Sequence, residues 1–181
     1  MPKTLLTGPP GCGKTTLIRK VVAQLPVPAG GFYTQELRDA RRARLGFEIV
    51  TLDGQRGTLA HVDIRSPQRV GKYGVDLAAL DGLAVEAVRR TLELGRLVVI
   101  DEIGPMELLS PRFREIVLDV LESETSLLAT VVQRSTPFTD LLKRRPGLTL
   151  LEVRPDNREV LPARILSMLF GPQRHKEHEA G

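Results

Sequence analysis

The sequence predicts an α/β fold, with a mostly parallel sheet covered by helices on both faces and a small antiparallel β insertion. Three observations predict it. Apolar strand-like runs alternate with amphipathic helical segments over most of the chain. Residues 96–101, RLVVID, are almost continuously apolar, which is typical of a central parallel strand. Residues 31–64 instead contain three extended runs separated by turn signals, which favours antiparallel pairing there.

The individual elements follow from hydrophobic periodicity and cap residues. Extended apolar runs predict strands at 3–7, 31–37, 44–52, 58–64, 96–101, 126–132 and 148–153. Helical spacing predicts helices at 15–25, 76–95, 110–123 and 136–145, and a last helix that restarts at Pro162. Asp76 and Ser110 are the predicted N-caps, Pro111 follows at a first helical position, and Gly95 is a C-cap.

Size and composition indicate one globular domain. The chain has 181 residues, of which 41% are hydrophobic and 27% charged. No apolar run approaches the ~20 residues of a membrane span. The N-terminus does not resemble a signal peptide. The single cysteine, Cys12, excludes an intrachain disulfide. We expect a cytoplasmic monomer with no membrane partner, folded as one domain at 1–170 with its β-rich insertion at about 30–75, and a flexible tail at 171–181.

The charge balance is modestly basic. The net charge is +4, and the densest basic run is RDARRAR, residues 38–44. Such a balance suits nucleic acid or a small anionic ligand equally. Aromatic residues make up only 4% of the chain and there is no Trp, so the aromatic platforms on which bases stack are missing. We therefore interpret the basic run as a solvated hairpin or loop.

The strongest motif is GPPGCGKT, which satisfies the pattern G-x-x-x-x-G-K-[ST] in full. Glycines let the backbone curl so that successive N–H groups point at an anion, and the following helix N-terminus adds partial positive charge. Lys14 would reach the β- and γ-phosphates, and Thr15 would offer a hydroxyl to Mg²⁺. Cys12 has either a reactive thiol or simply a small side chain that fits. The motif predicts a phosphate-binding loop made of Gly8, Pro9, Pro10, Gly11, Cys12, Gly13, Lys14 and Thr15.

A pair of carboxylates supplies the second half of the predicted site. Asp101 ends an apolar strand and would hold Mg²⁺. Glu102 follows it directly and would orient and deprotonate an attacking water, which favours hydrolysis over transfer to a second substrate. Glu107 is either a supporting residue behind this pair or a surface residue. The only Asn, Asn157, is followed by Arg, so the Asn/Thr-Lys-x-Asp base reader of GTPases is absent and base selectivity should be low.

Other polar residues carry weaker signals. Any of four basic residues could act as an arginine finger on the γ-phosphate, although solvation or ion pairing is the alternative for each: Arg134, Lys143, Arg144 and Arg158. His61 falls in the predicted β insertion. His175 and His178 have metal-like spacing but lie in the tail.

Taken together, several segments resemble the thermostable nucleoside-triphosphatase family, also called the cancer-related nucleoside-triphosphatase family of P-loop NTPases. They are LTGPPGCGKTTLI (6–18), GFYTQE (31–36), RLGFEIVTL (44–52), VGKYGVDL (70–77), VIDEIGPMEL (99–108) and DNREVLP (156–162). The resemblance implies slow Mg²⁺-dependent hydrolysis of ATP, GTP and other nucleoside triphosphates, on a nucleotide-kinase-like core. It also implies nucleotide contacts at 8–15 and at Leu97, Val98, Val99, Ile100, Asp101, Glu102, Ile103 and Gly104.

Three hypotheses follow. The first is a nucleoside-triphosphatase acting on ATP, GTP, CTP and UTP, with Lys14 and Glu102 as catalytic residues and Thr15 and Asp101 as Mg²⁺ ligands. The second is a nucleotide or polynucleotide kinase, whose acceptor would bind the β insertion. The third is a binding module or switch that uses nucleoside triphosphate to control a nucleic-acid or protein partner, an interpretation motivated only by the basic run.

Overall fold

A computed structural model describes residues 1–171 of the chain. Within these residues nine strands form one sheet in the order β5-β6-β4-β3-β2-β7-β8-β1-β9. The strands are β1 (Lys3–Thr7), β2 (Ala29–Arg38), β3 (Arg44–Thr51), β4 (Arg56–His61), β5 (Arg69–Val70), β6 (Tyr73–Val75), β7 (Leu97–Ile103), β8 (Leu127–Val131) and β9 (Leu148–Glu152). The helices are α1 (Lys14–Val22), α2 (Leu77–Ala79), α3 (Glu86–Glu93), α4 (Pro111–Glu122), α5 (Pro137–Lys143) and α6 (Leu161–Phe170), with a π-helical segment η1 (Leu80–Val85) and a 3-10 turn η2 (Glu107–Leu109).

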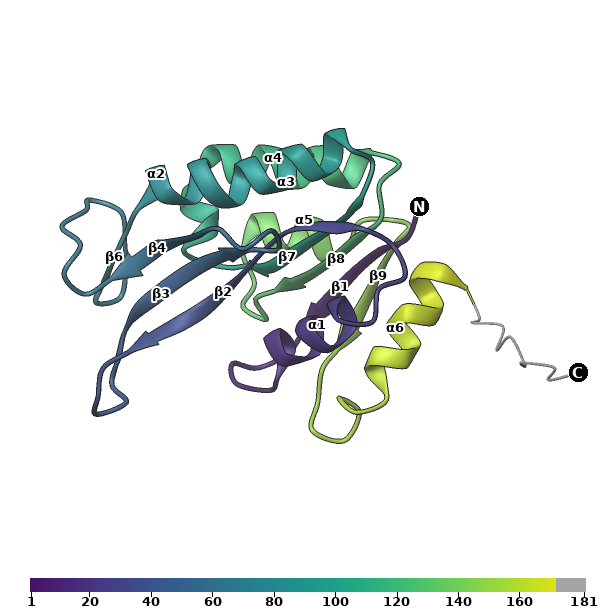
Figure 1. Cartoon of the computed structure of the whole chain (residues 1–181), viewed down its shortest axis with the longest axis horizontal. Coiled ribbons are helices and arrows are strands. Elements are labelled where there is room, and N and C mark those ends of the chain that lie inside the picture. The colour runs from purple at the N-terminus through teal and green to yellow at the C-terminus, as the bar shows by residue number, and fades with distance from the viewer. Residues whose placement is uncertain (172–181) are drawn as a thin grey trace, which may run out of the picture.

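The sheet has a parallel half and an antiparallel half. Strands β2, β7, β8, β1 and β9 pair in parallel, whereas β3, β4, β6 and β5 continue the same sheet in antiparallel fashion from β2. The predicted antiparallel insertion is therefore an extension of the main sheet, and β2 belongs to both halves (Figure 1). The very short strands β5 and β6 have no counterpart among the predicted elements.

Strand β2 starts two residues earlier than predicted because Ala29 and Gly30 pair with the first residues of β7. The close approach of these two strands requires glycine at position 31. Gly31 has φ +113°, and a Cβ there would lie 1.9 Å from the carbonyl oxygen of Val99. Any side chain at this position would therefore push β2 away from β7.

Helices cover both faces of the sheet, as predicted (Figure 1). On one face η1, α3 and α4 pack against the strands through a cluster that includes Leu5, Val98 and Phe113. On the other face α1 and α6 pack through a cluster that includes Leu6 and Val99. Successive residues of one strand point to opposite faces, so neighbours such as 5 and 6 contribute to different clusters.

The predicted helix starts are confirmed. The Asp76 carboxylate accepts a hydrogen bond from the Ala79 N–H at 2.9 Å, and the Ser110 hydroxyl accepts one from the Phe113 N–H at 3.0 Å. The predicted helix 76–95 differs in its middle, where η1 has wider π-type turns. The spacing of apolar residues cannot distinguish such a segment from an α-helix, because both bury one stripe of side chains.

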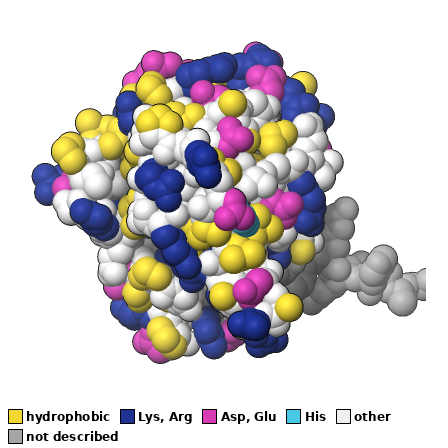
Figure 2. Space-filling model, turned by 90° about the vertical axis from the view of Figure 1, so that its left-hand side faces the viewer, with side chains coloured by type: hydrophobic (Ala, Val, Ile, Leu, Met, Phe, Trp, Pro, Cys, Tyr) yellow, Lys and Arg dark blue, Asp and Glu magenta, His cyan; other side chains and the backbone are white. Residues whose placement is uncertain are grey.

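The basic run at 38–44 forms the turn between β2 and β3, in agreement with the hairpin interpretation. Glu36 forms ion pairs with both Arg38 and Arg44, and the Asp39 carboxylate accepts hydrogen bonds from the N–H groups of Arg41 and Ala43. The face in Figure 2 shows Lys and Arg interspersed with acidic and apolar side chains. Of the four arginines in this run, Arg38 and Arg44 are thus paired with Glu36.

Among residues 1–171, none of the helices combines the length and apolar character that crossing a bilayer requires. The predicted flexible tail, with His175 and His178, falls at 172–181 and lies outside the described residues.

Candidate active site

The glycine-rich loop connects the buried strand β1 to helix α1 at the carboxyl edge of the parallel strands. Three glycines let it turn, since Gly8, Gly11 and Gly13 all have positive φ. A Cβ on Gly8 would lie 2.7 Å from the Val153 carbonyl oxygen. Gly13 is the N-cap of α1 and brings no side chain to accept from the first N–H groups of the helix. These donors are therefore available to an anion.

Lys14 folds back over this loop. Its ammonium donates to the carbonyl oxygens of Gly8, at 2.9 Å, and Pro9, at 3.2 Å. This places the positive charge at the mouth of the loop, where phosphate oxygens would compete for the same donors. Cys12 is buried beside Leu6 and Leu17, which supports its interpretation as a small side chain that fits.

Asp101 lies near the end of β7, which continues to Ile103, two residues beyond the predicted strand end, and β8 separates β7 from β1. The Asp101 side chain is buried, with 1% of the residue exposed. The Thr130 hydroxyl of β8 donates to Asp101 Oδ1 at 2.5 Å. Asp101 Oδ2 is buried and has no hydrogen-bond partner. Burial raises the pKa of Asp101, while the hydroxyls of Thr130 and Thr15 and the Lys14 charge act to lower it. An unpartnered buried carboxylate oxygen near a hydroxyl suits a cation such as Mg²⁺.

The protein alone would not surround that cation. Among residues 1–171 there is no group of three or more His, Cys, Asp or Glu side chains placed to hold a metal.

Glu102 lies in an irregular part of β7. The pairing of β7 with β8 shifts between Ile100 and Ile103, so the strict alternation of side chains is interrupted there. Burial raises the pKa of Glu102, Lys14 acts to lower it, and Asp101 raises it further. Lys14 thus lies within electrostatic reach of both carboxyl groups. The loop and the acidic pair meet at one edge of the sheet.

The remaining residues carried over from the resemblance are structural neighbours of this pair. Gly104 is buried directly beyond the pair, whereas the side chains of Leu97, Val98, Val99, Ile100 and Ile103 pack in the two hydrophobic clusters. A nucleotide contact from β7 would therefore come from Asp101, Glu102 or the backbone.

Glu107 is a buried residue, so the surface interpretation is wrong. It is 4% exposed. A Cβ built on Gly104 would lie 2.8 Å from Glu102 Oε1 and 3.1 Å from Glu107 Oε2, so the two carboxyl groups converge on this glycine. Burial, with smaller contributions from Glu102 and Asp101, raises the pKa of Glu107 to about 8, against the lowering effect of backbone N–H groups. At neutral pH Glu107 is mainly a neutral carboxylic acid beside Glu102.

Arg19 is a second residue that sequence reasoning missed. Its guanidinium lies 4.2 Å from the centroid of the Tyr33 ring and donates to the Gln35 side chain at 3.1 Å. It also lowers the pKa of Asp101. Its position four residues after Thr15 on α1 is the only signal in the sequence, since i and i+4 share a helix face.

The candidate arginine fingers lie on two different segments of the chain, three of them at or in α5 and one in the turn before α6. Arg134 and Arg144 are exposed at either end of α5, and the Lys143 ammonium donates to the Gln133 carbonyl oxygen at 3.0 Å. Arg158 is different, because its Cδ lies 3.9 Å from the position of a Cβ on Gly13. His61 lies in β4, as predicted, 3.4 Å from the Asp63 carboxylate.

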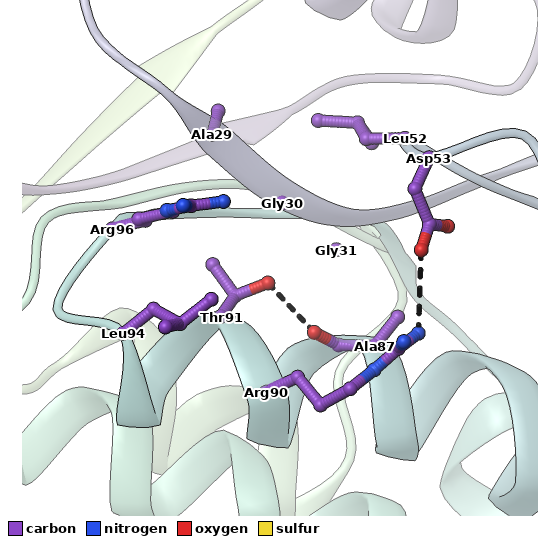
Figure 3. Close-up of a pocket in the computed structure, with 10 residues that line it drawn as sticks. All are labelled: Ala29, Gly30, Gly31, Leu52, Asp53, Ala87, Arg90, Thr91, Leu94 and Arg96. Atoms are coloured by element: carbon purple, nitrogen blue, oxygen red, sulfur yellow. Dashed lines mark hydrogen bonds and ion pairs between the residues drawn. The ribbon is translucent and has the colours of Figure 1, made fainter.

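Among residues 1–171, one cavity lies beside the sheet and another lies beside the phosphate-binding loop. One of about 300 Å³ lies at the amino ends of β2 and β7 and contains none of the predicted site residues. There Arg90 extends to Asp53, and the Thr91 hydroxyl donates to the Ala87 carbonyl oxygen (Figure 3). The other, of about 270 Å³, adjoins the phosphate-binding loop at Gly13.

One family model and several known proteins resemble this chain. Residues 3–166 match the family described as NTPase. Nucleoside-triphosphatase THEP1 of Thermotoga maritima is 46% identical over 167 residues, which cover 92% of this chain and 95% of that protein. The crystal structure of THEP1 from Aquifex aeolicus has a TM-score of 0.85 at 36% identity, covering 93% of this chain and 99% of that one.

The solution structure of a human cancer-related nucleoside triphosphatase has a TM-score of 0.80 at 34% identity, covering 96% of this chain and 100% of that one. These matches confirm the family resemblance found in the sequence and the predicted fold class. The matched range contains the glycine-rich loop, the carboxylate pair and Glu107. The chain therefore belongs to the NTPase family.

Proposed function

We propose that this chain hydrolyses nucleoside triphosphates to the diphosphate and phosphate, in a Mg²⁺-dependent reaction with low selectivity among ATP, GTP, CTP and UTP. It would act as a monomer, with one catalytic domain at 1–170. One observation carries the proposal: at the carboxyl edge of the parallel strands Lys14 folds over the phosphate-binding loop, and Asp101 has a buried oxygen, Oδ2, with no partner. A phosphate-binding cation and two carboxyl groups are thus assembled in one site.

Binding of the triphosphate is assigned to the loop and the first turn of α1. Backbone N–H groups of residues 11–15 surround the phosphates, since Pro9 and Pro10 have none, and the helix N-terminus contributes its partial positive charge. Lys14 exchanges its two carbonyl partners for oxygens of the β- and γ-phosphates. Charge-assisted hydrogen bonds to phosphate are stronger than those to a carbonyl, which favours this exchange.

Thr15 and Asp101 would hold the Mg²⁺. The unpartnered Asp101 Oδ2 and the Thr15 hydroxyl are the oxygen ligands that this ion requires. When bound, the ion supplies positive charge that offsets the charge on the β- and γ-phosphate oxygens. The Thr130 hydroxyl orients Asp101 from behind through its hydrogen bond to Oδ1.

Glu102 accepts the proton of the attacking water. As the water oxygen bonds to the γ-phosphorus, the bond to the oxygen bridging the β- and γ-phosphates breaks, and one water proton passes to the Glu102 carboxylate. The products are nucleoside diphosphate and inorganic phosphate. Glu107 is a positioning residue: as a neutral acid across Gly104 it holds Glu102 in place without adding a second negative charge.

Phosphate release from ATP, GTP, CTP and UTP, measured with Mg²⁺ and with EDTA, tests the proposed reaction. We expect similar turnover of the four substrates, dependence on Mg²⁺, and loss of activity in Lys14→Ala. A parallel assay with γ-labelled ATP and nucleosides, nucleoside monophosphates or 5′-hydroxyl oligonucleotides tests the kinase alternative. If label appears on an acceptor faster than it appears as free phosphate, the hydrolase assignment is refuted.

A further inference from the structure

The cavity of about 300 Å³ lies at the edge of the sheet opposite the phosphate-binding loop. It is placed where β2 and β7 begin, and helix α3 and the turn after β3 complete its walls (Figure 3). Arg96 lines it and precedes Asp101 by five residues of extended chain, which span ~16 Å. Within the described chain, its lining includes none of the residues assigned to the proposed reaction. The cavity is therefore a feature that the reaction does not use.

The floor of the cavity is bare backbone, because Gly30 at the start of β2 has no side chain. A Cβ on Gly30 would lie 2.1 Å from the Thr91 hydroxyl oxygen of α3, so a side chain there would separate the helix from the strand. The Thr91 hydroxyl donates to the Ala87 carbonyl oxygen at 2.6 Å and has no second proton to offer. The side-chain donors that the cavity can offer an anion are thus those of Arg90 and Arg96.

Two guanidinium groups share one carboxylate in this cavity. Arg90 reaches it from α3 and Arg96 from the residue before β7, while Asp53 lies in the turn after β3. Among residues 1–171, the only ion pair between these three joins Arg90 Nη2 to Asp53 Oδ2 at 3.4 Å (Figure 3). Two arginines against one aspartate leave the lining with a formal charge of +1. The cavity therefore favours an anion.

Arg90 is incompletely paired. Its Nε is buried without a hydrogen-bond partner, although Nε and Nη2 form the edge of a guanidinium that can bond both oxygens of one carboxylate. Asp53 does not complete this pairing, because the Thr51 hydroxyl and the Gln55 amide also donate to its carboxylate. Since 43% of the Arg90 side chain is exposed, its guanidinium can turn toward an anion in the cavity. Such a turn would give the orphaned Nε an acceptor.

The rest of the wall is apolar. Leu52 contributes from the turn after β3, Leu94 from the end of α3, and Ala29 and Ala87 lie beside them. Leu94 is 60% exposed, so covering it with an apolar group would be favourable. The volume is at the lower end of the range for ligand sites, which suits a molecule of about ten non-hydrogen atoms. The wall thus predicts an anion with a small apolar body.

We propose that this cavity binds a small organic monocarboxylate, whose carboxylate pairs with Arg90 and Arg96 and whose apolar body contacts Leu94. A single negative charge neutralises the lining, whereas a phosphate dianion would leave excess negative charge beside Asp53. The planar carboxylate also matches the guanidinium fork. The site goes beyond the proposed function and does not depend on it, because the cavity and the catalytic edge share no residue.

Titration of the ¹⁵N-labelled chain with sodium benzoate, followed by two-dimensional NMR at matched sodium chloride, tests this site. We expect saturable shifts of the amide signals of Gly30, Gly31 and Arg96, with a Kd on the order of 1 mM for a ligand of this size. The signals of Gly11 and Gly13 should stay in place, which separates this site from the phosphate-binding loop. Benzamide, the uncharged analogue, should bind at least about tenfold more weakly. Shifts confined to the loop, or no saturable shift at all, would overturn the proposal.

Variants assign the binding to individual side chains, and the amide spectrum of each one reports whether it folds. Arg90→Ala and Arg96→Ala should each weaken benzoate at least about tenfold. Arg89→Ala is the matched control, since this arginine of α3 pairs with two glutamates of its own helix and does not line the cavity. Asp53→Asn should tighten benzoate about threefold, because it removes a competing negative charge and keeps the side-chain shape. Unchanged or weaker binding in Asp53→Asn, or equal weakening by Arg89→Ala, would contradict the proposal.

Phenyl phosphate distinguishes a carboxylate site from a phosphate site. Because a phosphate can also bind the glycine-rich loop, only the signals of Gly30 and Gly31 are followed in this titration. We expect them to report weaker binding of phenyl phosphate than of benzoate. Equal or tighter binding of phenyl phosphate at these two glycines would refute the assignment to a monocarboxylate.

Discussion

The buried Glu107 predicts a specific pH dependence of stability. The folded chain keeps this carboxyl protonated up to about pH 8, whereas in the unfolded chain it ionises near its ordinary pKa of 4.5. Between these values the folded state binds more protons than the unfolded state, so the free energy of unfolding must fall as pH rises. Glu107→Gln cannot titrate and therefore lacks this contribution. The variant should gain stability over wild type as the solution becomes alkaline.

The size of this effect follows from the two pKa values of Glu107, 4.5 and about 8. One proton linked to folding changes the free energy of unfolding by ~1.4 kcal/mol per pH unit, so the span amounts to ~5 kcal/mol as an upper bound. Relaxation around the ionised group reduces it, and we expect a difference of at least ~2 kcal/mol between mildly acidic and mildly alkaline solution.

Urea unfolding of the metal-free chain at about pH 5, 7 and 9 measures this difference. The relevant quantity is the stability of Glu107→Gln minus that of wild type at each pH. Glu115→Gln, at an exposed position on α4, controls for the loss of one carboxyl group. A difference that is constant with pH within ~0.5 kcal/mol would refute the burial argument, because an accessible carboxyl would account for it.

Three further variants test separate parts of the structure. Gly104→Ala places a methyl group against both Glu102 and Glu107, so turnover should fall at least about tenfold while calorimetry shows retained nucleotide binding; unchanged turnover would contradict the convergence of these carboxyls. Asp101→Asn should weaken activation by Mg²⁺ in a titration of phosphate release against metal concentration, and an unaltered titration curve would remove Asp101 as a ligand. Phe113→Ala should lower the free energy of unfolding by about 3–5 kcal/mol in urea, since this ring is fully buried; a loss below ~1 kcal/mol would argue against its place in the core.

Features encoded by neighbouring residues were predictable from the sequence. The glycine-rich loop, the apolar strand that carries Asp101, and the caps Asp76 and Ser110 each depend on residues within a few positions of one another. Local chemistry determines such features, because a cap or a phosphate-binding turn is formed by consecutive backbone groups. The order of the motifs was also sufficient for the family resemblance.

Features that depend on long-range packing were not predictable. The surface and supporting interpretations of Glu107 could not be separated, since the residue types around it do not indicate the 3-10 turn that buries it beside Gly104. Arg19 appeared as one more polar residue on α1 until its contact with Tyr33 of β2 brought it near Asp101. Arg158 lies more than 140 residues from the loop it adjoins. Apolar periodicity likewise could not reveal the π-type turns of η1.

The central claim is that Glu102 turns water into the attacking group while other residues hold the nucleotide. Glu102→Gln keeps the shape of the side chain and removes its basicity, so single-turnover phosphate release from ATP, measured beside calorimetric nucleotide affinity, tests it most directly. The account predicts nucleotide affinity close to wild type and a hydrolysis rate lower by at least about 10²-fold, the usual contribution of a general base. Hydrolysis at close to the wild-type rate in Glu102→Gln would contradict it.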